Sequence, residues 1–502
     1  MRREQIPVLT PSISHKAHGT LPDEAVEQAV CNAARMAQRR WELRPVRERV
    51  QTVRRLRFLL ARDAELLANA VPLEVAGNLQ RSLADTLVAE VLPLAEACRF
   101  LEREAVAILA GQRLSNRSRP FWLRRVTAEV SREALGIVLV IGPANYPLFL
   151  PGVQVLQALV AGNAVLWKPA ATGVAAAHAL QQLLTEAGLP AELLAILNAA
   201  PAAAERAIAM GVDKVILTGH VDTGRAVLRR LAETVTPSVM ELSGCDAVFV
   251  LDGADCERAA RAIAFGMRLN GSATCMAPRR LFVAATVADA LLPLLHREFA
   301  QLSLMSVSEP IRKQLERLME DARIRGARVT LDDGGPYTLR SVLIERAQPE
   351  MAVMQSDVFA PLLSVMEFSD IEDALTAHRR CAYALTASVF GPEKVAAALA
   401  RRIHAGTVLV NDLIVSAADP RVSFGGRGKS GFGLTRGREG LLEMTAQKTV
   451  LIQRERNYRA YASTRKAHVS FFAAYIRMVH GGLWRQRVKG IRALSAAARK
   501  LR

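Results

Sequence analysis

One cysteine of the chain has the surroundings of a reactive thiol. Cys275 lies in a stretch of small and polar residues rather than inside an apolar helix. Arg279 and Arg280 follow it and add positive potential, which lowers the pKa of a nearby thiol. These features predict a partly accessible thiolate that attacks an electrophilic carbon. The simpler alternative is a buried, inert cysteine, which is the commoner fate of a single Cys.

An acid and an amide upstream could assist such a thiol. Glu241 follows an apolar segment and precedes Gly244, and burial there would raise its pKa into the range of a general base. Asn145 is held between two prolines in the loop 142–147, directly after an apolar strand. Its side-chain amide could donate to a developing oxyanion. Taken singly, Glu241 could be an ordinary strand-end acid and Asn145 an ordinary turn residue.

Two further segments have features of a phosphate or ribose site. Lys168 ends an apolar strand, and ligands of open α/β sheets dock at the carboxyl ends of strands. The loop from Gly219 to Gly224 leads from a strand into a helix, so its glycines allow close approach and the helix N-terminus favours anions. It is neither a GxGxxG nor a Walker loop. Lys168 could equally be a charge that merely reaches toward solvent.

The elements that must position these residues follow an alternating α/β pattern. Residues 22–110 have apolar residues at helical spacing. From 136 onward strands alternate with helices, which indicates a parallel sheet, and a second α/β region runs from about 247 to 411. The predicted strands are Gly136–Ile141, Ala164–Trp167, Leu194–Asn198, Lys214–Leu217, Leu281–Ala284, Leu363–Phe368 and Thr407–Val410, and Phe121–Glu133 alternates as a strand does.

The uncharged stretch from Ala134 to Trp167 could be mistaken for a membrane span. Glycine and proline pairs interrupt it repeatedly, whereas a spanning helix needs about 20 mostly uninterrupted apolar residues. Two buried strands around a turn and a helix explain it better. Residues 1–21 lack the apolar region of a secretory signal. The six cysteines show no metal-ligand spacing, which fits a reduced cytoplasmic protein without a metal.

In this order and spacing the segments resemble the motifs of the aldehyde dehydrogenase superfamily. The interval of 34 residues from Glu241 to Cys275 is also like that of the family. The resemblance covers roughly residues 22–452 and therefore concerns the whole fold. The matching segments are the Asn loop 142–147, the Lys-Pro-Ala strand end 168–170, the Thr-Gly loop 218–224, Glu241–Gly244, Cys275, Asp357–Pro361 and the Gly-rich loop 424–431.

The resemblance implies an α/β fold with a Rossmann-type cofactor domain, an α/β catalytic domain and a small oligomerisation flap. The expected bounds are 1–117 with 134–242 for the cofactor domain, 243–445 for the catalytic domain, and 118–133 with 446–456 for the flap. The strands Arg125–Val130 and Thr449–Gln453 would build an intersubunit sheet, as in dimers of the family. A homodimer or tetramer is therefore expected.

The resemblance also implies roles for individual residues. Cys275 would attack an aldehyde, Asn145 would stabilise the oxyanion, and Glu241 would activate water to release a carboxylic acid. NAD or NADP would be the cofactor. Its expected contacts are Pro143 and Ala144 in the Asn loop, Lys168 at the ribose, Gly219, His220 and Gly224 near the phosphates, and Asp357 and Phe359 at the nicotinamide.

Several residues depart from the family pattern. Ala171 stands where the family often has a glutamate that binds the ribose 2′-hydroxyl. A carboxylate there would repel the 2′-phosphate of NADP, so its absence makes NADP acceptable. His220 replaces a serine, Asp357 is shorter than the usual glutamate, and Ser272-Ala273 replaces Gly-Gln before the cysteine. Two other functions stay open: an acylating or reductive relative that transfers the thioester to coenzyme A, and a non-catalytic scaffold on the same fold. Glu241 favours hydrolysis over transfer.

Composition places these motifs in an ordinary folded body with a basic end. The chain has 502 residues, 51% of them hydrophobic and 23% charged, which excludes disorder and predicts several domains. Its net charge is +18, but residues 453–502 hold 13 Lys and Arg against one acid, Glu455. A basic appendage of this kind gives no reason to expect a nucleic-acid partner.

The basic end, residues 457–502, has the pattern of amphipathic helices. Apolar residues from Val469 to Leu501 recur at helical spacing with basic residues between them, and Gly481-Gly482 divides the segment in two. Such helices lie on anionic membranes, which would place a cytoplasmic enzyme on the inner face of a membrane. The alternatives are a tail that packs on the enzyme or a partner, and a disordered tail.

Overall fold

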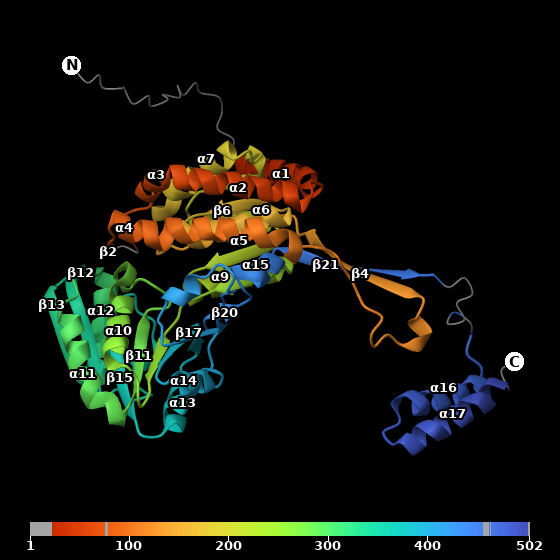
Figure 1. Ribbon diagram of the computed structural model, residues 1–502. Coiled ribbons are helices and arrows are strands. Elements are labelled where there is room, and N and C mark those ends of the chain that lie inside the picture. Colours follow the sequence, from red (N-terminus) through yellow and green to blue (C-terminus); the bar gives the residue numbers. More distant parts are fainter. Residues whose placement is uncertain (1–22, 76–78, 455–460, 462, 500–502) are drawn as a thin grey trace, which may run out of the picture. The chain divides into compact units, whose positions relative to one another are not determined.

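The computed structural model describes residues 23–75, 79–454, 461 and 463–499 (Figure 1). Contacts divide the chain into two units. The body comprises Met1–Gly111 and Ser131–Lys448, and the appendage comprises Gln112–Val130 and Thr449–Arg502. The expectation for residues 1–21 lies outside the described residues.

The first sheet of the body has the strand order β20-β9-β8-β5-β6-β7. All neighbours are parallel except β20, which runs antiparallel to β9 and comes from the distant Gly-rich loop. The predicted strands are therefore confirmed with small changes at their ends. The bounds are β5 Ile137–Ile141, β6 Ala164–Lys168, β7 Leu194–Ile196, β8 Lys214–Thr218, β9 Ser238–Glu241 and β20 Gly431–Phe432.

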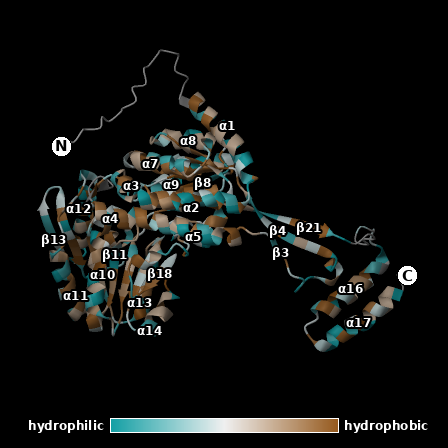
Figure 2. Cartoon of the chain, turned by 45° about the horizontal axis from the view of Figure 1, so that its top comes forward, coloured by the Kyte–Doolittle hydropathy of each residue, from teal (hydrophilic) through white to brown (hydrophobic). Residues whose placement is uncertain are grey.

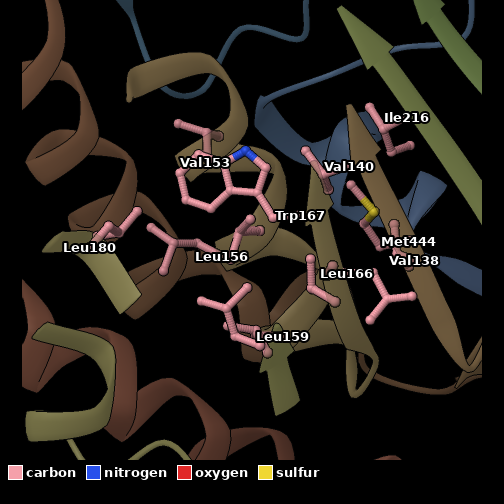
Figure 3. Close-up of a cluster of buried hydrophobic side chains, with 14 of the residues drawn as sticks. Val138, Val140, Val153, Leu156, Leu159, Leu166, Trp167, Leu180, Ile216 and Met444 are labelled. Atoms are coloured by element: carbon pink, nitrogen blue, oxygen red, sulfur yellow. The ribbon is translucent and has the colours of Figure 1, made fainter. Parts of the chain in front are cut away.

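The stretch predicted as two strands around a helix has that structure. The helix α6 (Phe149–Ala161) joins β5 to β6, and all three are buried nearly throughout. Figure 3 shows Trp167 of β6 packed toward Val153 and Leu156 of α6. Apolar side chains thus cover this sheet directly, which explains why the segment carries no charge.

Helices enclose this sheet and include most of residues 23–108. Among the described residues the prediction of helix from 22 to 110 is confirmed over most of its length. The exceptions are the short connections at 43–45 and 63, the segment between Ala70 and Ser82 where two short strands pair, and the residues after Ile108. Part of the fourth helix is wound as a π-helix. The bounds are α1 Asp23–Glu42, α2 Val46–Arg62, α3 Ala64–Asn69, β1 Glu74–Val75, β2 Leu79–Gln80, α4 Leu83–Thr86, π-helix Leu87–Val91, α5 Leu92–Ile108, α7 Val174–Glu186, α8 Pro201–Ala209 and α9 Val221–Thr234.

The second sheet has the order β12-β14-β15-β11-β10-β17-β18, and β13 pairs with β14. Its side chains alternate between two apolar layers. One layer holds α10 (Cys256–Arg268) and α11 (Ala285–Ala300), and the other holds α12 (Glu309–Ile324), α13 (Ile371–Arg380) and α14 (Glu393–Ala400). The strands are β10 Asp246–Val250, β11 Pro278–Ala284, β12 Met305–Ser306, β13 Arg328–Gly335, β14 Thr338–Glu345, β15 Leu362–Phe368, β17 Thr386–Phe390 and β18 Thr407–Val410.

The appendage contains strands and a helical hairpin. A sheet of order β21-β4-β3 is built from β3 (Gln112–Arg113), β4 (Val126–Ala134) and β21 (Thr445–Gln453). The strand predicted from Phe121 begins only at Val126, because Pro120 starts a 3₁₀ turn over Phe121–Leu123.

The two predicted tail helices are confirmed as α16 (Lys466–His480) and α17 (Trp484–Arg499), separated at Gly481-Gly482. The last predicted tail residue, Leu501, lies outside the described residues. No helix in the described part of the chain is long and apolar enough to cross a membrane.

Candidate active site

The loop before Cys275 has an unusual backbone. Asn270, Gly271 and Ser272 all have left-handed φ angles, of +50°, +55° and +67°. Ser272 stands where the family pattern has glycine, which adopts this conformation without strain. Its hydroxyl donates to the carbonyl of Ala360 at 2.9 Å, which offsets part of that strain. The loop thereby holds Cys275, partly exposed, just before β11.

Asn145 reaches the cysteine loop from the carboxyl end of β5. Its Nδ2 donates to the carbonyl oxygen of Ala273 at 2.9 Å, and Asn270 donates to the same oxygen at 3.2 Å. The next residue, Tyr146, shares a hydrogen bond of 2.8 Å with Thr274 Oγ1. An amide nitrogen carries two hydrogens, so Asn145 retains one for a ligand.

Glu241 ends β9 and is fully buried. The antiparallel strand β20 approaches it so closely that a Cβ on Gly431 would lie 1.8 Å from the carbonyl oxygen of Met240, and Gly431 has φ +102°. Thr435 Oγ1 donates to Glu241 Oε2 at 3.1 Å, whereas Oε1 has no partner among the described residues. Burial raises the pKa of Glu241, and Arg436 and Thr435 oppose that rise.

Cys275 and Glu241 line one cavity of about 1100 Å³. The thiol packs in an apolar cluster with Met276 and Phe424, which also line the cavity. The structure therefore brings together a thiol, a buried carboxylate and an apolar pocket. Asn145 approaches the same loop through Ala273.

The expectation of a lowered thiol pKa is wrong for this structure. Burial raises the pKa of Cys275 well above its usual range, and Glu241, Asp246 and Asp357 add to the rise. Arg279 instead donates to Ser272 Oγ at 2.6 Å and to Ala360 O at 2.8 Å. Arg280 donates to the Cys245 carbonyl at 2.9 Å. Both guanidinium groups thus serve the scaffold around the loop.

A buried ion pair that sequence reasoning missed connects the loop of Asn145 with the loop of Cys275. Arg81 Nη1 lies 2.7 Å from Glu90 Oε1, and both side chains are at most 2% exposed. Arg81 Nη2 donates to the Asn145 carbonyl and to Asn270 Oδ1, each at 2.7 Å. The sequence feature that could have revealed this pair is Glu90, an acid inside the apolar run from Leu87 to Leu92.

Glu90 completes this network at the other end of the Asn145 loop. Its Oε2 accepts hydrogen bonds from the backbone N–H of Leu148 at 3.1 Å and of Phe149 at 2.6 Å, where α6 begins. A carboxylate at a helix N-terminus is favoured by the exposed N–H groups there. The Arg81–Glu90 pair therefore fixes Asn145 from both sides.

The predicted cofactor residues lie at the carboxyl edge of the first sheet. Lys168 ends β6, is half-buried and forms no ion pair with a described residue, and burial lowers its pKa. Pro143 and Ala144 follow β5, and Gly219 follows β8. A cation without an ion pair to a described residue, together with the N-terminus of α9 at this edge, fits a dinucleotide.

Two of these residues have further structural roles. His220 is the N-cap of α9, where its Nδ1 accepts from the Asp222 N–H at 3.3 Å. Gly224 approaches Leu242, since a Cβ there would lie 2.9 Å from the leucine side chain. Gly224 thereby allows α9 to pack closely against Leu242, the residue after Glu241.

Asp357 and Phe359, the residues expected at the nicotinamide, lie next to the cysteine loop and the strand that follows it. Asp357 Oδ1 is 3.8 Å from Arg279 Nε, and burial raises the pKa of Asp357 to about 6. Phe359 packs on Ala273 and Met305. Among the described residues no three His, Cys, Asp or Glu side chains gather as a metal site.

A thiol and a buried acid share one cavity, and an amide from the first sheet contacts the loop of the thiol. The model of the aldehyde dehydrogenase family matches residues 1–450. The chain belongs to this family and is an oxidoreductase that acts on aldehydes.

Relatives of known name support this assignment. The chain is 30% identical over 453 residues to a 4,4'-diapolycopene aldehyde oxidase of Methylomonas, covering 88% of this chain and 84% of that protein. It superposes on an NAD-dependent aldehyde dehydrogenase of Sinorhizobium meliloti with a TM-score of 0.79, at 26% identity, over 86% of this chain and 88% of the other. It also superposes on an NADP-dependent glyceraldehyde-3-phosphate dehydrogenase of Bacillus halodurans complexed with NADP. The TM-score is 0.78 at 27% identity, over 86% of this chain and 91% of the other.

The buried pair leads to a stability prediction. Arg81→Met leaves the Glu90 carboxylate buried without its partner, so the free energy of unfolding should fall by about 3–5 kcal/mol. Urea denaturation measures the change. Arg54→Met is the control, because Arg54 is exposed and lies 3.4 Å from Glu102, a surface pair whose loss should cost about 0–1 kcal/mol. Equal effects of the two substitutions would contradict the importance of the buried pair.

Proposed function

We propose that the chain oxidises an aldehyde to a carboxylic acid through a covalent intermediate on Cys275. The observation that carries this proposal is the unpartnered Oε1 of the buried Glu241 in the cavity that also contains Cys275. A carboxylate oxygen without a protein partner in such a cavity is suited to hold and deprotonate a water molecule.

The first bond forms between the Cys275 sulfur and the aldehyde carbon. The carbonyl oxygen gains negative charge, and the free Nδ2 hydrogen of Asn145 stabilises it. Such a donor is typically worth about 2.7–4 kcal/mol. The network of Arg81 and Glu90 holds Asn145 in place for this role. The product of this step is a thiohemiacetal on Cys275.

NAD or NADP fits the edge formed by Lys168, Gly219 and the start of α9. The chemistry that the cofactor supplies when bound is acceptance of the hydride that the thiohemiacetal must lose to become a thioester. Pro143, Ala144, His220, Gly224, Asp357 and Phe359 are the further proposed contacts. Ala171 carries no carboxylate that would repel a 2′-phosphate, and the related structures include both an NAD-dependent and an NADP-dependent enzyme.

Hydrolysis of the thioester completes the reaction. Glu241 takes a proton from water as the water attacks the acyl carbon, and the Cys275 thiolate leaves. Transfer to coenzyme A would not require this buried base, so Glu241 supports hydrolysis over the acylating alternative. The non-catalytic scaffold is disfavoured by the joint presence of Cys275, Glu241 and Asn145.

The body of the aldehyde is proposed to be apolar. The cavity walls include Tyr146, Phe149, Leu150, Met276 and Phe424, and the thiol itself packs among apolar side chains. Apolar walls gain free energy by covering apolar substrate surface. The Methylomonas relative is named a 4,4'-diapolycopene aldehyde oxidase.

Two substitutions test the catalytic roles. Cys275→Ala should abolish aldehyde-dependent reduction of NAD or NADP, measured by cofactor absorbance with a panel of apolar and carboxylate-bearing aldehydes. Glu241→Gln should keep a single-turnover burst but slow steady turnover by about 10²–10⁴-fold, because the general base is lost. Retained turnover in Cys275→Ala, or strict dependence on coenzyme A, would contradict the proposal.

We further propose that the appendage sheet joins two copies of the chain, as a homodimer or within a tetramer. β21 is exposed along nearly its whole length, and Val450, Leu451 and Ile452 are 39–66% exposed. An uncovered apolar edge strand is a template for another strand. A second copy would cover it.

Light scattering after size exclusion tests this association. The wild-type protein should have the mass of two or four chains. Leu451→Lys should lower that mass, because it places a charge on the proposed contact. Leu43→Lys is the matched control, since Leu43 is an 82% exposed leucine of the body. A monomeric wild-type protein would contradict the intersubunit sheet.

The appendage is also proposed to bind the anionic inner face of a membrane. It holds 18 of the 66 Lys and Arg but only 2 of the 48 Asp and Glu, Glu129 and Glu455, so it carries +16 of the net +18. Each basic residue near an anionic surface contributes about 1 kcal/mol. Five arginines surround one hollow without an ion pair to any described carboxylate: Arg113, Arg119, Arg124, Arg125 and Arg454.

The helical hairpin leaves its large apolar residues exposed. α16 and α17 approach through small residues, because Ala474 and Ala497 are buried and a Cβ on Gly490 would lie 2.4 Å from the Met478 nitrogen. Both helices alternate hydrophobic and hydrophilic residues around their surface (Figure 2). The exposed apolar side chains are Val469, Phe472, Ile476, Val479, Leu483, Trp484 and Ile491, at 39–70%. A lipid interface would cover them and meet the basic residues between them.

Vesicle flotation tests the membrane proposal. The full chain should float with vesicles of phosphatidylcholine and phosphatidylglycerol and should do so less at high salt, which screens the charges. Phe472→Ser with Trp484→Ser should reduce flotation. Phe58→Ser is the control, because Phe58 is a 52% exposed phenylalanine of the body. A wild-type protein that stays unbound at low salt would contradict the proposal.

A further inference from the structure

Arg436 is a buried cation in the wall of the cavity that contains Cys275 and Glu241. It follows Thr435, the residue that hydrogen-bonds Glu241, and precedes α15 (Gly437–Glu443). Neither its sequence position nor the mechanism above assigns it a role. Burying an ion is among the most unfavourable transfers in a protein unless the ion is paired and hydrogen-bonded, so the contacts of Arg436 are informative.

The surrounding structure holds the Arg436 side chain in one position. Its Nη1 donates to the carbonyl of Ala417 at 2.8 Å, and its guanidinium lies 4.5 Å from the ring centre of Phe424 and 5.9 Å from that of Phe149. Its Nε has no partner among the described residues. Stacking on aromatic faces keeps the guanidinium charged and fixed.

The backbone of Arg436 is strained. Its φ of +59° with ψ of 174° lies in a region that is essentially restricted to glycine. A non-glycine residue persists there only when its surroundings hold it, and such residues cluster at functional sites. The strain directs the arginine side chain into the cavity wall beside Thr435.

We infer that Arg436 is an electrostatic positioning residue, whose charge stabilises the Cys275 thiolate and the ionised Glu241 in the apolar cavity. This inference rests on the proposed function, because it concerns the same thiol and the same base. Arg436 touches neither of the bonds that form or break and acts only through these two groups.

The charges around the thiol explain why such a cation is needed. Glu241, Asp246 and Asp357 all oppose ionisation of Cys275, and burial opposes it further. Arg436 opposes these effects and favours the thiolate, and the Arg279 guanidinium also interacts with Cys275. Arg436 and the Thr435 hydrogen bond also favour the ionised form of Glu241 against its burial.

The thiol itself provides the test, without aldehyde or cofactor. The rate of Cys275 alkylation by iodoacetamide is measured between pH 6 and 10, with mass spectrometry of the Cys275 peptide to separate it from the other cysteines. Arg436→Gln keeps a donor for the Ala417 carbonyl but removes the charge. At pH 7.5 it should slow alkylation by about tenfold, because loss of the charge raises the thiol pKa further and leaves less thiolate.

Two further variants separate charge from structure. Arg436→Lys should restore most of the alkylation rate, because it restores the charge. Arg438→Gln should match the wild type, since Arg438 is an exposed arginine two residues away. The inference is overturned if Arg436→Gln alkylates as the wild type does, or if the lysine variant is as slow as the glutamine variant.

Two control measurements, of folding and of the pH dependence of turnover, accompany the alkylation experiment. Circular dichroism checks that each variant is folded, and if Arg436→Gln is not, a slow Arg436→Lys protein overturns the inference by itself. The pH profile of turnover should also shift to higher pH in Arg436→Gln, because both the thiol and Glu241 ionise later. If aldehyde oxidation survives in Cys275→Ala, the proposed function is wrong. If Cys275→Ala is inactive but Arg436→Gln has the same alkylation profile as the wild type, only the role of Arg436 is wrong.

Discussion

The buried Arg81–Glu90 ion pair is the contact on which the geometry of the active site depends most. Its nitrogen and oxygen lie 2.7 Å apart between side chains that are at most 2% exposed. Its remaining donors and acceptors hold the Asn145 loop, the start of α6 and the turn at Asn270. A buried ion pair contributes little net stability over an apolar replacement, but it specifies which groups must meet. Here it makes the loop of Asn145 and the loop of Cys275 one connected structure.

Much of the fold follows from the sequence because its signals are local. The apolar strand at Ile137–Ile141 and the two tail helices are set by periodicity and by glycine breaks, and the structure has them in place. Cys275 and Glu241 could be singled out because each has an unusual residue type for its surroundings. The start of β4 could not be predicted from the sequence. The alternating pattern already begins at Phe121, whereas Pro120 imposes a turn that delays the strand to Val126.

The parts of the site that sequence did not reveal depend on contacts between distant residues. Arg81 and Asn270 are 189 positions apart, so only the folded chain brings them together. The opposite error occurred at Arg279 and Arg280, which are adjacent to the thiol in sequence. They lie in β11, where successive side chains point to opposite faces of the sheet, and both are used by the scaffold.

The uneven distribution of charge has a consequence for how the protein behaves in an electric field or on a charged resin. The body carries a net charge of only +2, because the appendage holds +16 of the +18. Electrophoretic mobility and retention on a cation exchanger are therefore properties of the appendage. A single proteolytic cut that released the end of the chain would change both sharply while leaving the thiol, the base and their supporting ion pair intact.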